Sequence, residues 1–183
     1  MNVHAIHLPN QARCFLIDCF LPQSHLATVH EICEAFSKES AAWQHPEWTT
    51  YRYIYQNNTP EWQSVADYLK APNPELTKAL GYAVTCDEVL LWAEFQGIGV
   101  LQPHVEIPGG KNLSQLYITK QPVPNNGTTI YTNQKEILCL LPYRDNFGWF
   151  FDDSGQVMHG RDNDVPPDII RFTMMMHWSK ATH

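Results

Sequence analysis

Positive charge is scarce in this chain of 183 residues. There are 12 Lys and Arg residues against 19 Asp and Glu residues, and the formal net charge is -7. A protein that binds nucleic acid through phosphate groups needs basic side chains gathered on one surface, whereas the basic residues here are few and scattered. The composition therefore argues against a nucleic-acid partner.

Long apolar runs and paired cysteines are missing as well. No apolar stretch approaches the roughly 18 residues of a membrane-spanning helix, and the opening residues MNVHAIHLPN lack the basic and apolar segments of a signal peptide. The five cysteines are odd in number, irregularly spaced and without a C-x-x-C pair, which disfavours a disulfide framework. These absences predict a protein of the reducing cytoplasm with no membrane partner.

Residues 1–86 combine strand-like segments with helix signals. Ser24 is a candidate N-cap ahead of apolar residues at helical spacing. Thr59, followed by a proline, begins a second helix, and residues 73–84 repeat that signature. We therefore predict an N-terminal strand with supporting helices.

Residues 87–178 have a different pattern. Short strand-like segments, about seven in number, are separated by loops rich in Pro, Asn and Gly. Helices followed by a run of strands predict an α+β protein that is mainly β. We expect a double-sheet barrel or sandwich with the N-terminal helices packed against one sheet, in a single domain spanning residues 1–183.

The stretch LQPHVEIPGG carries a candidate metal site. Residues two apart on a strand point to the same face, so His104 and Glu106 can bind one ion together. His159 is the best third ligand, because it follows an aromatic strand and lies among small and polar residues. Two histidines and one carboxylate are typical of a non-haem Fe(II) oxygenase site. Taken alone, however, the pair of His104 and Glu106 is better explained as a chance arrangement on a surface strand.

The segment RFTMMMHW adds a candidate anion site. Alternation along a strand places Arg171, Thr173, Met175 and His177 on one face. An arginine in an apolar strand is costly to bury without a partner, and a bidentate carboxylate ligand would offset that cost. The order His104, His159, Arg171 therefore favours a metal site with an oxo-acid co-substrate.

Several of these motifs together carry a resemblance to a family. QPHVE resembles the x-P-H-x-D motif of the prolyl-hydroxylase-like branch of the Fe(II)- and 2-oxoglutarate-dependent oxygenases, with Glu106 in place of aspartate. NGTTIY is similar to its G-G-x-T-x-F turn, GWFFDDSGQVMHG resembles the strand that ends near the distal histidine, and RFT resembles its R-x-S/T pair. The opening CFLIDCFLPQSHLATVHEICEAF also resembles the first strand and helix of this branch.

The resemblance implies a double-stranded β-helix, or jelly roll, whose core is residues 87–178. It implies Fe(II) held by His104, Glu106 and His159, with 2-oxoglutarate held through Arg171 and Thr173, and ascorbate as an accessory reductant. Oxidation of an unactivated C–H bond, commonly hydroxylation, is the implied reaction. The implied substrate is an amino acid, a peptide or another small molecule.

One hydroxyl that relatives use is missing from its expected place. Leu101 stands where many relatives have a tyrosine three residues before the first histidine. We expect Tyr117, Thr119 or Tyr131 to supply the hydroxyl that helps to hold 2-oxoglutarate.

Two rival interpretations remain. One is a cupin-like barrel that binds a metal or small molecule, although cupins usually gather more histidines. The other is a catalytically degenerate member of the family, which Glu106 and Leu101 suggest. Arg144 and Arg161 flank the mouth of the expected barrel and could contact a substrate, but we expect them to be solvated loop charges. We expect His177 to be a partly buried hydrogen-bonding residue.

Overall fold

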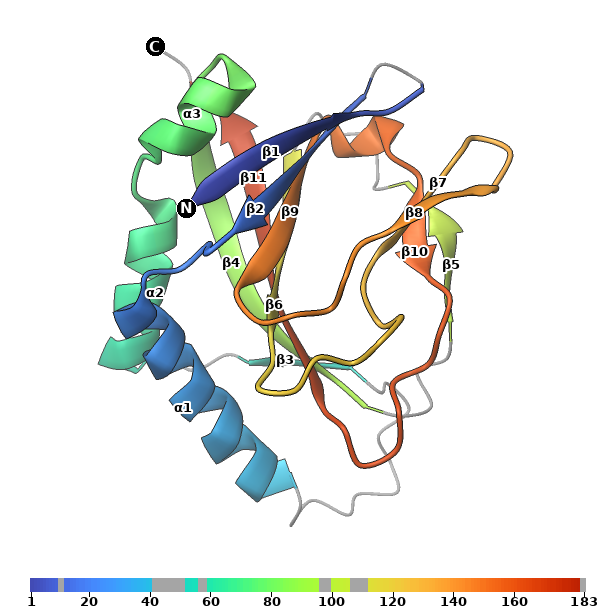
Figure 1. Ribbon diagram of the computed structural model, residues 1–183. Coiled ribbons are helices and arrows are strands. Elements are labelled where there is room, and N and C mark those ends of the chain that lie inside the picture. Colours follow the sequence, from blue (N-terminus) through green and yellow to red (C-terminus); the bar gives the residue numbers. More distant parts are fainter. Residues whose placement is uncertain (10–11, 41–51, 56–58, 96–99, 106–111, 182–183) are drawn as a thin grey trace.

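Two antiparallel sheets form the body of the protein (Figure 1). The computed structural model describes residues 1–9, 12–40, 52–55, 59–95, 100–105 and 112–181. The strands of the larger sheet, in spatial order, are β1 (Asn2–His7), β2 (Arg13–Asp18), β9 (Phe147–Asp152), β6 (Asn112–Ile118), β11 (Arg171–Lys180), β4 (Val84–Glu94) and β3 (Arg52–Tyr55). Those of the smaller sheet are β5 (Leu101–His104), β10 (His159–Arg161), β7 (Thr129–Tyr131) and β8 (Ile137–Leu140). The predicted jelly roll, mainly β, is confirmed.

Three helices cover the outer face of the larger sheet (Figure 1), as predicted. They are α1 (Gln23–Ser40), α2 (Pro60–Lys70) and α3 (Pro74–Leu80), and a short 3-10 helix, η1 (Ser154–Gln156), follows β9. Thr59 caps α2 by accepting a hydrogen bond from the amide of Trp62, and the side chain of Asn73 caps α3 in the same way. Each helix then has proline in its first turn, where no intrahelical donor is needed.

The prediction that Ser24 caps α1 is wrong. The helix begins at Gln23, and the amide of Leu26 donates to the carbonyl of Pro22, so Ser24 lies inside the first turn. The reason is tertiary: the side chain of Asn146 accepts from the amide of Leu21 and donates to its carbonyl. This contact fixes the chain just before the helix and lets α1 begin earlier than its own sequence indicates.

Strand β11 divides the interior into two parts. Phe172, Met174, Met176 and Trp178 belong to the core cluster that includes the helices. The alternate residues Arg171, Thr173 and Met175 face the space between the two sheets, as their alternation predicted. The same strand therefore supplies both the packing core and the polar interior.

All five cysteines are free, in agreement with the absence of a disulfide pattern. Burial raises the pKa of the Cys14 and Cys33 thiols, so both stay protonated and unreactive at neutral pH. Among the residues that the structure describes, no helix combines the length and apolar character needed to cross a bilayer.

Candidate active site

A cavity of about 310 Å³ lies between the two sheets. Strands of both sheets line this cavity, so residues that are far apart in the sequence meet there. Its lining is formed by Trp92, Glu94, Leu101, Leu113, Gln115, Thr128, Trp149, His159, Gly160, Arg161, Arg171, Met175 and His177.

One side of this site is lined by His159, and the ring of His104 lies against it from the neighbouring strand; we call this pair the histidine wall. The antiparallel pairing of β5 with β10 places the two residues opposite each other, with ring centroids 4.6 Å apart. In each ring Nδ1 lies within hydrogen-bond distance of the carbonyl two residues before it, 2.8 Å for Gln102 and 3.0 Å for Val157. A carbonyl only accepts, so Nδ1 carries a proton in both rings, and in a neutral ring Nε2 is then the nitrogen with the lone pair that could bind a metal.

Gly160 allows the histidine wall to form. A Cβ atom at this position would lie 2.4 Å from the carbonyl oxygen of Leu101, which is closer than a carbon atom tolerates. Only glycine therefore lets β10 approach β5 closely enough to set His159 against His104. Strand β10 was not predicted, because three residues are too few to show an alternating pattern.

The third predicted ligand, Glu106, lies outside the described residues. Within the described ranges, no group of three or more His, Cys, Asp or Glu side chains is arranged to hold a metal ion. The structure thus brings two of the three predicted ligands together.

The large-sheet side is lined by Arg171 on β11 and Glu94 on β4; together with the fully buried Thr173 of β11 we call these residues the arginine wall. Arg171 is buried, its Nε donates to the carbonyl of Asn126 at 3.0 Å, and its guanidinium forms an ion pair with Glu94. The rings of Tyr117 and Tyr143 lie 5.4 and 5.1 Å from the guanidinium carbon, within cation–π range. Burial alone would lower the pKa of Arg171, but the Glu94 carboxylate raises it above its ordinary value, so the group stays charged.

The expected partner of Arg171 was the carboxylate of a ligand, whereas the structure supplies an internal one. Glu94 and Arg171 are directly opposite in the pairing of β4 with β11, so their side chains share a face. The same carboxylate oxygen, Oε2, also accepts from Nη1 of Arg161 at 3.0 Å. Glu94 therefore joins two buried arginines, one from each sheet.

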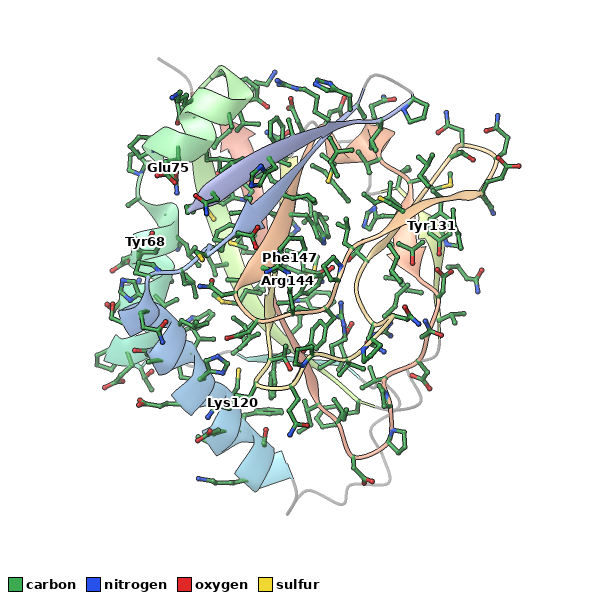
Figure 2. The ribbon with its side chains drawn as sticks, viewed as in Figure 1. Tyr68, Glu75, Lys120, Tyr131, Arg144 and Phe147 are labelled. Atoms are coloured by element: carbon green, nitrogen blue, oxygen red, sulfur yellow. The ribbon has the colours of Figure 1, made fainter. Side chains whose placement is uncertain are left out.

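Arg161 corrects a prediction. It is buried in the cavity and not a solvated loop charge, because it lies on β10 two residues after His159 and points into the same space. Arg144, by contrast, is a surface residue: it pairs with Asp18 and lies 4.4 Å from the centroid of the Phe147 ring (Figure 2).

Two polar groups of the arginine wall lack a hydrogen-bond partner among the described residues. The Thr173 hydroxyl is buried without a hydrogen-bond partner. Burying an unpaired hydroxyl costs free energy unless a bound ligand supplies the missing hydrogen bond. Among the described residues, Nη2 of Arg171 also has no acceptor, while its Nε and Nη1 are engaged. Both groups suit an incoming carboxylate.

The hydroxyl candidates are placed differently. Tyr117 lies beneath Arg171, but its hydroxyl donates to Thr128 and accepts from Trp149, and burial raises its pKa. Tyr131 lies on the small-sheet side of the molecule (Figure 2), where its hydroxyl donates to Asp162. The Thr119 hydroxyl donates to the carbonyl of Gln121 in an exposed turn. The Tyr131 and Thr119 hydroxyls therefore do not lie at the arginine wall. Tyr117 contacts Arg171 through its ring and not through its hydroxyl.

His177 agrees with the prediction of a partly buried hydrogen-bonding residue. Its Nδ1 lies 2.9 Å from the carboxylate of Glu88, and its ring borders the cavity together with Met175. It lies on β11, away from the β5–β10 pair that holds the other two histidines.

Glu94 and Gln115 were not predicted as site residues, and Arg161 was expected to be a solvated charge rather than a site residue. Glu94 interrupts an apolar strand as Arg171 does, so the same reasoning about burial cost could have identified it. Arg161 could have been found by the two-residue alternation from His159. Gln115, whose Oε1 accepts from the Thr128 hydroxyl at 3.0 Å, carries no such signal because glutamine is common on exposed strands.

Comparison with solved structures identifies the architecture. The non-heme alpha-ketoglutarate-dependent epimerase SnoN from nogalamycin biosynthesis matches with a TM-score of 0.64 at 11% identity, over 92% of this chain and 78% of that chain. The fold is that of the 2-oxoglutarate-dependent non-haem oxygenases. Two further structures agree. A prolyl hydroxylase from Trichoplax adhaerens in complex with a hypoxia-inducible-factor peptide has a TM-score of 0.62 at 13% identity, over 91% and 83% of the two chains.

HygX from Streptomyces hygroscopicus, crystallised with nickel and 2-oxoglutarate, has a TM-score of 0.60 at 11% identity over 92% and 82%. No family model matches the sequence, and no curated protein matches it significantly. At such identities the likeness to these oxygenases establishes the fold, and function depends on the residues of the cavity.

Proposed function

We propose that this protein is an Fe(II)- and 2-oxoglutarate-dependent oxygenase that oxidises a C–H bond, most simply by hydroxylation. The observation that carries the proposal is the pairing of two walls in one fold: His104 against His159 on one side, and Arg171 with an unpartnered Thr173 hydroxyl on the other. A histidine pair alone would suit many metal proteins, and a buried arginine alone would suit many anion sites. Together they match the needs of a metal with a carboxylate co-substrate.

In this proposal His104 and His159 bind the metal through Nε2, and Glu106 supplies the carboxylate. The backbone carbonyls on Nδ1 fix the tautomer and the orientation of both rings. Trp149 and Phe151 pack against the ring of His159, at centroid distances of 5.7 and 5.1 Å, and keep that side of the metal dry. Two imidazoles and one carboxylate leave coordination positions open on Fe(II).

The arginine wall holds the co-substrate. Nη2 of Arg171 and the Thr173 hydroxyl donate to the distal carboxylate of 2-oxoglutarate, while the rings of Tyr117 and Tyr143 keep the guanidinium in place. When bound, Fe(II) and 2-oxoglutarate supply the oxidising power, with succinate and carbon dioxide as co-products and ascorbate as an accessory reductant. The chain orients both partners and excludes water.

The substrate belongs to the class of amino acids, peptides and other small molecules. Fold neighbours include a prolyl hydroxylase with a bound peptide and HygX, which has also been crystallised with hygromycin B. Leu101, Trp92 and Met175 line the cavity and offer it apolar contact surface. These side chains favour an uncharged carbon segment beside the metal.

A second candidate is a barrel that binds a ligand without oxidising it. The ion pair of Glu94 with Arg171 favours this alternative, because the arginine already has a carboxylate. The two candidates differ in whether 2-oxoglutarate binds and is consumed.

The deciding experiment combines binding with turnover. The protein is loaded anaerobically with Fe(II), 2-oxoglutarate is added, and the visible charge-transfer band is recorded; oxygen and ascorbate then start succinate release. We expect the band and slow succinate formation in the native protein, and neither in His159→Ala. His4→Ala, an exposed histidine on β1, is the matched control and should behave as native. Absence of both signals in the native protein would exclude the enzyme and leave the binding alternative.

A further inference from the structure

Three charged side chains meet inside the protein at the arginine wall. Arg161, Arg171 and Glu94 are all buried, with 4%, 4% and 3% of their side chains exposed. Both guanidinium groups use Nη1, and both reach the same carboxylate oxygen. They come from three strands, β10, β11 and β4, so the cluster connects the small sheet to the large one.

Among the described side chains, this cluster holds more positive than negative charge. Two guanidinium groups and one carboxylate sum to one positive charge. A single additional carboxylate, such as the distal group of 2-oxoglutarate, brings the sum of the four groups to zero. Two guanidinium groups around one carboxylate leave Arg171 able to bind an incoming anion.

The geometry also says which arginine receives that anion. Arg171 has an unused Nη2 among the described residues, and the orphan hydroxyl of Thr173 is on the same face of β11. An incoming carboxylate at these two donors competes with Glu94 for Arg171. Glu94 does not have to become an isolated buried charge, because Nη1 of Arg161 still holds it at 3.0 Å.

We propose that Glu94 is an internal competitor of the co-substrate for Arg171, and that Arg161 is the positioning residue that retains Glu94 when 2-oxoglutarate binds. This inference rests on the proposed function and deepens it. Arg161 does not contact the co-substrate here; it acts through Glu94. The cavity therefore keeps its buried arginine paired before binding and releases it for the ligand afterwards.

The test is a double-mutant cycle read as the dissociation constant of 2-oxoglutarate, measured calorimetrically on the Fe(II)-loaded protein without oxygen. Arg161→Gln leaves Glu94 to compete fully for Arg171, so we expect binding to weaken by about tenfold or more, with Fe(II) affinity unchanged. Arg161→Lys keeps the charge and should restore binding to within about threefold of native. Glu94→Gln removes the competitor and should tighten binding by about fivefold or more.

The double variant Glu94→Gln/Arg161→Gln decides between two roles. If Arg161 acts only through Glu94, the double variant binds at least as tightly as native. If the double variant is as weak as Arg161→Gln, the arginine contacts the ligand directly and the proposal is overturned. Glu88→Gln makes the same chemical change on β4, at a half-exposed residue that pairs with His177, and should leave binding unchanged.

Folding and function are read separately in this design. The melting temperature of each variant, with and without 2-oxoglutarate, shows whether a weak binder is folded, and Glu94→Gln should gain more stabilisation from the ligand than native protein does. Native affinity that is insensitive to both Glu94→Gln and Arg161→Gln would overturn the inference alone. Absence of 2-oxoglutarate binding in native protein and in Glu94→Gln would overturn the proposed function with it.

Discussion

The histidine wall and the arginine wall differ in charge and in burial. The histidine wall is made of imidazole rings on two short strands, β5 at the edge of the small sheet and β10 beside it, and His104 is only half-buried. The arginine wall is made of buried charges on the neighbouring strands β11 and β4 of the large sheet, and each charge is paired. Imidazole rings can remain in a partly open site without a bound metal, whereas buried charges need partners even when no ligand is bound. The difference suggests that the arginine wall contributes to stability, and the histidine wall mainly to metal binding.

Removing a charge from the arginine wall should give the largest effect. In Glu94→Leu the carboxylate that joins the two buried arginines is lost, and we expect the free energy of unfolding to fall by about 3–5 kcal/mol. His104→Leu, at the other wall, should cost less than about 1 kcal/mol, because the ring is only half-buried. Chemical denaturation measures both. Similar costs for the two variants would remove the proposed difference between the walls.

Separating the histidines should be the next largest effect. Gly160→Ala places a methyl group against the carbonyl of Leu101, so β10 must move away from β5. We expect Fe(II) affinity to fall by about tenfold or more, since ligand orientation is lost. The control is Gly155→Ala, where the nearest atom to the new methyl would be at 3.5 Å. Unchanged metal affinity in Gly160→Ala would show that the His104–His159 contact does not matter for binding.

Thr173→Val tests the orphan hydroxyl with opposite effects on stability and binding. The valine is nearly isosteric and removes an unsatisfied buried hydroxyl, so the free energy of unfolding should stay the same or rise by up to about 1 kcal/mol. Binding of 2-oxoglutarate should weaken by about tenfold, because a hydrogen bond to a charged group is lost. Thr129→Val, whose native hydroxyl donates to Asp162 at 2.6 Å, should show the reverse: a loss of stability with binding retained.

The smallest effect on binding is expected at Tyr131, outside both walls. Burial and the Asp162 carboxylate raise the pKa of Tyr131 to about 12, so its hydroxyl remains a donor at neutral pH. Because the folded pKa lies above that of the unfolded chain, this contribution to stability is complete below about pH 10 and is lost as the pH rises toward 12. Tyr131→Phe should therefore abolish this pH-dependent term and leave the affinity for 2-oxoglutarate unchanged. A weaker affinity of this variant for 2-oxoglutarate would indicate that Tyr131 contacts the co-substrate.

Much of this protein could be predicted from local patterns. Alternation along β11 predicted which residues of that strand face inward, and the caps Thr59 and Asn73 with their prolines predicted α2 and α3. The arginine in an apolar strand predicted that Arg171 needs a carboxylate partner, although the predicted partner was a ligand and the one found is Glu94. These features depend on the two-residue period of a strand and the hydrogen-bond needs of a helix end, both of which are written in neighbouring residues.

The partners across the fold could not be predicted in the same way. Nothing in the sequence near Arg171 shows that its carboxylate partner is Glu94, 77 residues earlier, or that Arg161 shares it. Those contacts follow from the register of β4 against β11 and from the closure of the small sheet over the large one. The sequence determined which side chains are too costly to leave alone in the interior; the tertiary structure decided which of them meet, because charge pairing depends on distance in space and not on separation along the chain.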